Sequence, residues 1–248
     1  MGSSMNRKWI RRLLALGLGL LVIVGIGMVW LQTSIYQPSK SAQLALSTAQ
    51  SKSDYYLLED KQVKKKQSII LYPGALVDSG SYGIWAEQLA KQGYRVYLLK
   101  APFSLAILDA NQADKVISQN KGERFYLAGH SLGGVIASRY ASKHPKEIAG
   151  MIYLASYPDK KGSLAQKNIP VLSITASNDG VLNWKNYREA KKYLPKNTTS
   201  YSIAGGNHGG FGSYGKQKGD KSANISNLNQ QKQISTEIDR WIVSQNNN

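Results

Sequence analysis

Residues 129–133, with the sequence GHSLG, have the composition of a turn that exposes a reactive serine. The preceding residues 124–128 are typical of a buried strand, and the residues that follow the turn favour a helix. A sharp turn from a strand into a helix strains the backbone of its central serine, and small neighbours let the two elements pass closely. The pattern therefore predicts that Ser131 is a nucleophile. The alternative is a glycine-rich turn in which Ser131 only caps the helix.

A serine nucleophile requires a general base, and the chain has three histidines. His130 belongs to the turn itself, where we expect it to point away from the reactive side of the serine. His144 lies at the expected end of a helix, where a solvated residue is typical. His208 lies in a glycine-rich loop, residues 205–212, directly after the last expected strand. We therefore predict that His208 is the base.

The base needs an acid to orient it, and the acid is expected between the serine and the histidine in the chain. Two of the candidates, Glu147 and Glu189, lie beside basic residues at the end of a helix or within one, as partners in surface ion pairs do. Asp179 instead follows the expected strand 170–175, at the carboxyl edge of the sheet where Ser131 is also expected. We predict Asp179 as the acid and keep Asp159 as the alternative. The four acidic residues of this interval are Glu147, Asp159, Asp179 and Glu189.

Acyl transfer also requires two N–H groups that stabilise the negative charge on the carbonyl oxygen. One is expected from Leu132, which follows the nucleophile, and the other from Ala75, in the turn after the expected strand 68–72. Candidates for the substrate pocket are Phe103, Leu105 and Tyr157, although each is equally compatible with a place in the core.

Short apolar runs alternate with amphipathic segments from residue 54 onward, which is typical of a parallel sheet with crossover helices. No lid-sized insertion lies between residues 151 and 170, which predicts an open pocket for small acyl groups and no large cap domain. The expected strands are 55–58, 68–72, 95–99, 124–128, 151–154, 170–175 and 198–203. The expected helices lie between Ser81 and Gly93 and over 106–118, 132–143, 183–193 and 230–243.

Residues 13–31 form an uncharged apolar run, long enough to cross a bilayer core as a helix. Four basic residues precede it, so residues 1–12 are expected to stay in the cytoplasm while the rest of the chain is exported. We predict an uncleaved, single-pass signal anchor in the cell membrane. A cleaved signal peptide and a core helix are the alternatives. Residues 32–53 are polar and are expected to form a linker to a domain over 54–248.

The composition excludes several kinds of site. The chain has no cysteine, so it contains no disulfide, thiol nucleophile or cysteine-bound metal. We expect neither a metal nor a cofactor. The 32 basic and 15 acidic residues give a net charge of +17, but the lysines are spread over many elements without a nucleic-acid-binding motif. We therefore expect no nucleic-acid partner, and anionic envelope polymers are the contact that such a surface favours.

Several segments together resemble a family of small bacterial alpha/beta hydrolases that lack a large lid and are related to dienelactone-hydrolase-like enzymes. The resemblance covers about residues 55–244. It implies the α/β-hydrolase fold, with a mostly parallel, doubly wound sheet flanked by helices. It also implies cleavage of a carboxylic ester or related acyl bond by Ser131, His208 and Asp179 through an acyl-enzyme. The segments are 70–75 (ILYPGA), 99–103 (LKAPF), 129–134 (GHSLGG), 176–180 (ASNDG) and 205–212 (GGNHGGFG).

The sequence therefore predicts a membrane-anchored, extracytoplasmic serine hydrolase that acts on a small acyl or ester substrate. Two other functions are left open. The chain could be an acyltransferase or peptidase that acts on cell-envelope components, or a catalytically inactive scaffold that binds at the cell surface.

Overall fold

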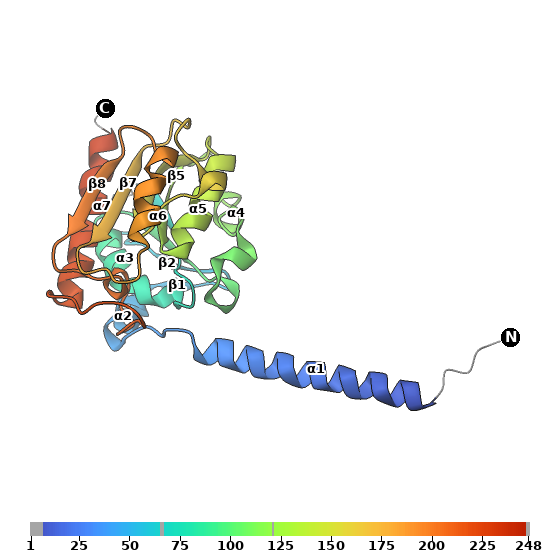
Figure 1. Cartoon of the computed structure of the whole chain (residues 1–248). Helices are drawn as coiled ribbons and strands as arrows, with labels where there is room; N and C mark the ends of the chain where they lie inside the picture. Colours follow the sequence, from blue (N-terminus) through green and yellow to red (C-terminus); the bar gives the residue numbers. More distant parts are fainter. Residues whose placement is uncertain (1–6, 65–66, 121, 247–248) are drawn as a thin grey trace. The chain divides into compact units, whose positions relative to one another are not determined.

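The computed structural model describes residues 7–64, 67–120 and 122–246, which divide between residues 35 and 36 into two compact units. The first unit contains the helix α1 (Arg7–Thr33), and residues 1–6 of the expected basic N-terminus lie outside the described residues (Figure 1). By length and composition, Arg11–Thr33 is able to cross a membrane. It is the single described helix with that property.

The second unit is built on an eight-stranded sheet with the spatial order β1-β2-β4-β3-β5-β6-β7-β8. The six strands from β4 to β8 in this order are parallel, so their carboxyl ends meet at one edge, which we call the catalytic edge. β1 and β2 are antiparallel additions on the β4 side. The strands are β1 (Gln50–Ser51), β2 (Tyr55–Leu58), β3 (Ser68–Tyr72), β4 (Arg95–Leu99), β5 (Phe125–His130), β6 (Ile148–Leu154), β7 (Val171–Ala176) and β8 (Thr199–Ile203).

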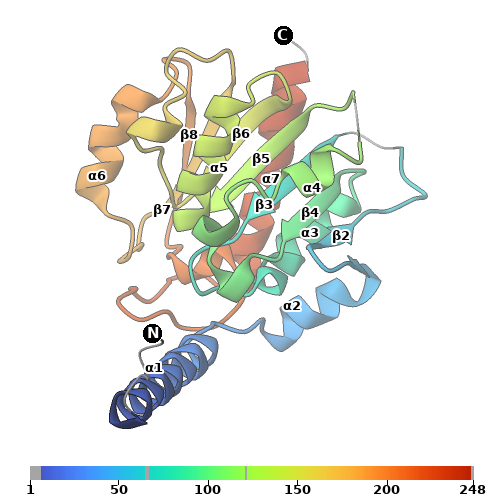
Figure 2. The same ribbon diagram turned by 90° about the vertical axis from the view of Figure 1, so that its right-hand side faces the viewer.

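Helices cover both faces of the sheet, because successive side chains of a strand point to opposite faces. The helices α3 and α7 lie on one face of the sheet, and α4 and α5 lie on the other (Figure 2). Ile69 and Leu71 of β3 belong to the core under α3 and α7, whereas Ile70 and Tyr72 belong to the core under α4 and α5. The helix α6 lies on the α5 face, where the Tyr187 hydroxyl hydrogen-bonds with Ser173 at 3.0 Å. The helices are α3 (Gly83–Ala90), α4 (Asp114–Ile117), α5 (Leu132–Lys143), α6 (Trp184–Glu189) and α7 (Asn227–Asn246).

This architecture confirms the predicted doubly wound, mostly parallel sheet. Two local expectations were wrong. The segment expected as one helix over 106–118 is a 3-10 turn (Ala106–Asp109) followed by the short α4. The strand β1 was not expected, and it is only two residues long.

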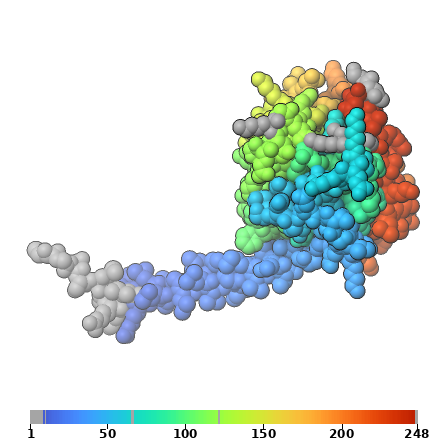
Figure 3. Space-filling view, turned by 180° about the vertical axis from the view of Figure 1, so that it is seen from behind, coloured from blue at the N-terminus to red at the C-terminus, as the bar shows by residue number. Residues whose placement is uncertain are grey.

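The expected linker over residues 32–53 is also corrected, because the chain from Tyr36 onward belongs to the second unit. Tyr36 bridges to Val77, and the helix α2 (Lys40–Ala45) buries Ala42 and Ala45. In the space-filling view this part of the chain lies on the surface of the unit (Figure 3). The segment looked like a linker because its few buried side chains are small. The domain therefore begins at Tyr36 and not at residue 54.

Candidate active site

Ser131 lies at the turn between β5 and α5, as the sequence predicted. Its φ of 51° and ψ of −123° lie outside the regions that favour residues with a side chain. Two hydrogen bonds hold this conformation: the Ser131 N–H donates to the Leu154 carbonyl at 3.0 Å, and the Ser156 hydroxyl donates to the Ser131 carbonyl at 2.5 Å. The neighbouring strand β6 and the loop that follows it therefore stabilise the strained serine.

The glycines of the turn are required by close approach of the backbone. A Cβ atom on Gly129 would lie 2.4 Å from the Cα atom of Gly134, and one on Gly133 would lie 2.3 Å from the Pro73 carbonyl oxygen. Neither approach leaves room for a side chain. The contact at Gly133 also brings the serine turn against the turn after β3, which carries Ala75.

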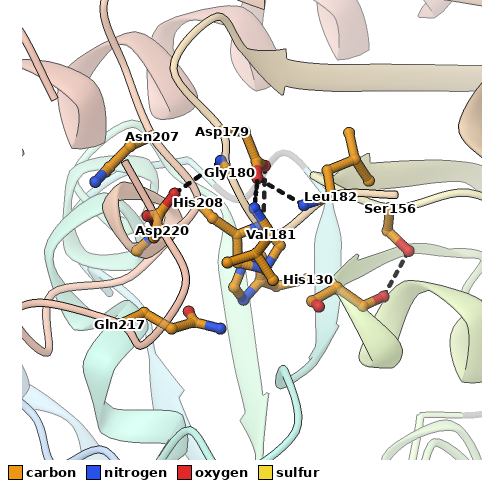
Figure 4. Close-up of polar contacts among 12 residues, drawn as sticks. His130, Ser156, Asp179, Gly180, Val181, Leu182, Asn207, His208, Gln217 and Asp220 are labelled. Carbon is orange, nitrogen blue, oxygen red and sulfur yellow. Dashed lines mark hydrogen bonds and ion pairs between the residues drawn. The ribbon is translucent and has the colours of Figure 1, made fainter. Parts of the chain in front are cut away.

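Asp179 and His208 are joined by a buried hydrogen bond (Figure 4). The Asp179 Oδ2 atom lies 2.8 Å from Nδ1 of His208, and both side chains are almost fully buried. The other carboxylate oxygen, Oδ1, accepts hydrogen bonds from the N–H groups of Val181 at 2.8 Å and Leu182 at 2.7 Å. Because a carboxylate accepts and Nδ1 then donates, the neutral imidazole presents an unprotonated Nε2.

The Nε2 atom of His208 is buried and has no hydrogen-bond partner among the described residues. His208 and Ser131 line the same cavity, of about 230 Å³. No hydrogen bond joins them in the part of the chain that the structure describes, and such bonds commonly tighten only when substrate binds. A buried base that lines the same cavity as a half-buried serine is able to remove the proton of the serine hydroxyl.

The two expected oxyanion donors also lie at this edge of the sheet. The N–H groups of Leu132 and Ala75 donate to no other group within the described residues. Leu132 is the first residue of α5, where the helix dipole favours negative charge. Ala75 lies between two anchored neighbours: the Gly74 N–H donates to the Tyr82 hydroxyl at 2.9 Å, and the Leu76 N–H donates to the Ser104 carbonyl at 2.8 Å.

The comparisons with known proteins agree with this fold. A sequence profile of the alpha/beta hydrolase family matches residues 68–232. The chain belongs to this family. The match is to the family as a whole, so the resemblance to dienelactone-hydrolase-like enzymes stays an expectation. No curated protein matches the chain in sequence.

The fold of the hydrolase is similar to many solved structures. One is an alpha/beta hydrolase enzyme from the metagenome of sediments of the Mar Chica lagoon in Morocco, with a TM-score of 0.59 and 15% identity over 80% of this chain and 99% of that chain. A monoglyceride lipase from Saccharomyces cerevisiae has a TM-score of 0.57 and 12% identity over 79% of this chain and 94% of that chain. A putative lipase from Acinetobacter baumannii has a TM-score of 0.57 and 15% identity over 84% of this chain and 96% of that chain. These structural similarities show that this chain has the same fold as the three proteins.

Of the expected pocket residues, the hydrolase places one at the cavity. Tyr157 lies on the cavity wall, with Leu132 and Leu182. Phe103 and Leu105 are not among the described residues that line it, and Phe103 is 48% exposed. The structure therefore does not place these two residues in the cavity of Ser131; they lie in the loop after β4, where Phe103 and Ser104 have positive φ values.

The alternative acid, Asp159, does not reach His208. Its carboxylate pairs with Arg139 at 2.5 Å and accepts a hydrogen bond from the Gly162 N–H at 2.9 Å. His144 stacks on Tyr140 at the end of α5, with ring centroids 4.3 Å apart. Among the described residues, no cluster of three histidine, aspartate or glutamate side chains could hold a metal ion.

Sequence reasoning missed Asp220. Its Oδ2 atom accepts a hydrogen bond from the Gly209 N–H at 2.8 Å, and its Oδ1 atom accepts one from the Gly180 N–H at 3.0 Å (Figure 4). These glycines directly follow His208 and Asp179 in the chain. The sequence signal was the segment 214–220 (YGKQKGD), which also resembles the hydrolase family's segment between the histidine loop and the last helix, but it gave Asp220 no role of its own.

Sequence reasoning also missed the role of His130. The ring of His130 lies 4.6 Å from that of His208, centroid to centroid, and stacks on Phe211 at 5.7 Å. Its Nδ1 atom hydrogen-bonds with the Tyr82 hydroxyl at 2.9 Å. Burial, and then the positive charge that His208 can carry, hold the pKa of His130 well below its usual value. His130 therefore packs as a neutral ring between the base and the turn that carries Ala75.

Proposed function

We propose that this hydrolase is a membrane-anchored serine esterase that cleaves a carboxylic ester or related acyl bond. The observation that carries the proposal is the state of the His208 ring. Asp179 holds its Nδ1 atom, while its Nε2 atom is buried, unpartnered and lines the same cavity as Ser131. This is the geometry that a serine nucleophile needs from its base.

In the first half of the reaction, Nε2 of His208 takes the proton of the Ser131 hydroxyl as Oγ attacks the carbonyl carbon. Asp179 orients the ring and stabilises the imidazolium that forms. The N–H groups of Leu132 and Ala75 stabilise the oxyanion, and each such donor commonly contributes about 100-fold or more to the rate. The imidazolium then gives its proton to the leaving alcohol, which leaves an ester between Ser131 and the acyl group.

In the second half, water attacks the acyl-enzyme. His208 takes a proton from the water as its oxygen attacks the acyl carbon. When the tetrahedral intermediate collapses, the bond to Ser131 Oγ breaks and the imidazolium returns the proton to Oγ, which releases the carboxylic acid and regenerates Ser131 and neutral His208. The cavity of about 230 Å³ is smaller than the pockets that hold drug-sized ligands. It therefore favours a small acyl group.

The membrane part of the proposal rests on α1. The helix is long and apolar enough to cross a bilayer, and four basic residues lie in its first turns or just before its apolar part. The excess of positive charge at this end favours a cytoplasmic N-terminus. The catalytic unit would then lie on the other side of the membrane.

The test is turnover by the full-length chain in detergent micelles. We expect Ser131→Ala to lower the hydrolysis of p-nitrophenyl butyrate by about a thousandfold or more. The matched control is Ser142→Ala, on the last turn of α5 and away from the cavity, which should retain activity. A fluorophosphonate probe should label the unmodified protein and not Ser131→Ala. Unchanged turnover in Ser131→Ala would refute the proposal, and absence of labelling would favour the inactive-scaffold alternative.

A further inference from the structure

The end of α1 is covalently close to the catalytic edge. Only Ser34 and Ile35 separate the last residue of α1, Thr33, from Tyr36, the first residue of the hydrolase unit. Even a fully extended chain places Tyr36 within about 11 Å of Thr33. This limit depends only on the length of the connection, whatever direction the helix takes.

Tyr36 is tied to the turn that carries Ala75. Its N–H donates to the Leu76 carbonyl at 2.7 Å, and its own carbonyl accepts from the Asp78 N–H at 3.0 Å. These two bonds form a parallel bridge across Val77. The chain that leaves α1 therefore joins the hydrolase unit beside one of the proposed oxyanion donors.

The same short segment is tied to the loop that follows His208. The Tyr36 hydroxyl accepts a hydrogen bond from the Lys218 N–H at 3.1 Å, and the Tyr36 ring lies 5.4 Å from that of Tyr214, centroid to centroid. Ser39 donates its N–H to the Ser213 carbonyl at 2.7 Å. We call residues 36–39 the junction segment. It ties two loops of the catalytic edge to the first residues of the hydrolase unit.

Three large apolar side chains lie exposed on a neighbouring loop of the same edge. The Leu76 N–H donates to the Ser104 carbonyl, which joins the loop after β4 to the loop that holds Tyr36. Phe103 and Ser104 both have positive φ values, of 51° and 53°, so the backbone turns sharply at this point. The exposed side chains, which we call the apolar tip, are Phe103 (48% exposed), Ile107 (52%) and Leu108 (57%).

The loop after Tyr214 presents positive charge beside the same segment. Lys216, Lys218 and Lys221 are exposed, and Lys218 is the residue whose N–H binds the Tyr36 hydroxyl. The nearest carboxylate in this loop, that of Asp220, is occupied by backbone N–H groups. In the loop of the apolar tip, Asp109 is paired with Lys115 at 3.1 Å. Asp78, whose N–H binds the Tyr36 carbonyl, is half-buried, and its carboxylate accepts a hydrogen bond from the Gly80 N–H at 2.8 Å. The fully exposed charges beside the junction segment are therefore basic.

The apolar part of α1 is bounded by tryptophan. Trp9 lies just before the apolar run 13–31 and Trp30 lies near its end, both exposed, and the 21 helical steps from one to the other span about 32 Å. That length matches the hydrocarbon core of a bilayer, and tryptophan is enriched at the two membrane interfaces. If α1 spans the bilayer, Trp30 lies at the interface. Tyr36 then lies within the depth of the lipid headgroups or just above them.

We propose that the catalytic edge rests on the bilayer surface, with the apolar tip inserted among the lipids and the lysines of the loop after Tyr214 against anionic headgroups. The acyl substrate is then an amphiphile held in that membrane, with its scissile bond at headgroup depth. The substrate part of this inference rests on the proposed esterase function and on the anchoring of α1. Apolar tips and basic residues are the pair of features that binds interfacial proteins to anionic membranes.

Docking is tested without any use of activity. Because the chain has no cysteine, a single one introduced by substitution can be labelled with the fluorophore NBD. Full-length Ile107→Cys and Val243→Cys are reconstituted in vesicles of phosphatidylcholine and phosphatidylglycerol. Val243 is the matched control, because it is also exposed but lies near the end of α7, beside Asn246, which hydrogen-bonds with Gln67 at the opposite edge of the sheet.

We expect nitroxide-labelled lipids to quench the probe at residue 107 strongly and the probe at residue 243 weakly. Equal quenching at both sites, or none at residue 107 in protein that floats with the vesicles, would overturn the docking. Protein that does not float with the vesicles would overturn the anchoring, and the docking with it. These outcomes are independent of whether Ser131 is a nucleophile.

The substrate class is tested with two butyrate esters that form the same acyl-enzyme. One is p-nitrophenyl butyrate in water, and the other is hexadecyl butyrate embedded in the vesicles. We expect the combined substitution Ile107→Ser and Leu108→Ser to leave the first activity unchanged and to lower the second by about tenfold. Val243→Ser should change neither. If the double substitution changed the hydrolysis of both esters equally, a membrane-resident substrate would be refuted. If Ser131→Ala kept both activities, the esterase function itself would be refuted.

Discussion

The Asp220 carboxylate accepts a hydrogen bond of 2.8 Å from the backbone N–H of Gly209, the residue that follows His208. Its other oxygen accepts one of 3.0 Å from the N–H of Gly180, the residue that follows Asp179. The proposed base and acid lie on loops that follow different strands, so local sequence alone does not set their separation. One side chain spans both loops, and this makes Asp220 a positioning residue for the pair.

We predict that Asp220→Asn lowers kcat by about 10- to 100-fold and changes KM little, because a misplacement of the base on the order of 1 Å has effects of this size. Asparagine has one acceptor oxygen and therefore serves only one of the two N–H groups. The measurement is steady-state hydrolysis of p-nitrophenyl butyrate by the full-length chain in micelles.

The matched control for this prediction is Asp159→Asn. Asp159 also accepts a backbone N–H bond in a loop after a parallel strand, but its other partner is Arg139, outside the cavity. We expect this variant to keep its kcat. A comparable loss in both variants would mean that Asp220 acts only through general stability of the loops.

Tyr82→Phe should lower kcat about tenfold, since the Tyr82 hydroxyl fixes the turn that carries a proposed oxyanion donor. The hydroxyl binds the Gly74 N–H and Nδ1 of His130, and both groups are buried. Leaving such groups unpartnered also costs about 1–3 kcal/mol of stability. Kinetics and urea unfolding measure the two effects.

The control variant is Tyr140→Phe. Its ring belongs to the core on the other face of the sheet, and its hydroxyl donates a hydrogen bond to the exposed Asp114 at 2.5 Å. This variant should lose stability and keep its kcat. The interpretation of Tyr82 would be wrong if the two variants showed the same ratio of lost activity to lost stability.

His130 should make the stability of the hydrolase depend on pH. Because burial lowers the pKa of His130 well below its usual value near 6.5, the unfolded chain binds a proton there before the folded chain does. This contribution to stability is complete above about pH 6.5 and is lost as the pH falls below it, by up to about 1.4 kcal/mol per pH unit.

The measurement compares urea unfolding of the full-length protein and of His130→Asn in micelles at several pH values. We expect the free energy of unfolding to fall less steeply below pH 6.5 in the variant than in the unmodified protein. His144→Asn replaces a partly exposed histidine at the end of α5 and should leave the slope unchanged. Parallel slopes for the unmodified protein and His130→Asn would contradict the prediction.

The sequence could predict those features that depend on residues close together in the chain or on general rules of strand geometry. The Ser131 turn was predictable because two of its glycines are required by contacts shorter than 2.5 Å that any side chain would make. His208 was predicted as the base by elimination of His130 and His144, and the structure places its ring beside Asp179, although the role as base stays a proposal. Asp179 followed from the rule that parallel strands bring their carboxyl ends to one edge, and the structure places it 2.8 Å from His208.

The features that sequence missed depend on contacts between distant parts of the chain. The segment 36–53 looked like a linker because α2 buries only two alanines and β1 has only two residues. Asp220 resembles any polar loop residue until its two glycine partners are known. Phe103 was named as a candidate for the pocket, equally compatible with the core, whereas the structure leaves it 48% exposed in a loop where its own φ is positive.

The small cavity beside Ser131 leads to a prediction about acyl-chain length. Tyr157 lies on its wall, and its ring packs edge to face on Tyr187 at 6.4 Å, so removing the ring enlarges the cavity toward α6. We expect Tyr157→Ala to raise the ratio of octanoate to butyrate hydrolysis by about 10-fold or more, as one or two accommodated methylene groups would. Tyr193→Ala, a tyrosine outside this cavity, should leave the ratio unchanged. If the ratio were unaltered in Tyr157→Ala, the acyl chain would have to extend from Ser131 along another wall of the cavity.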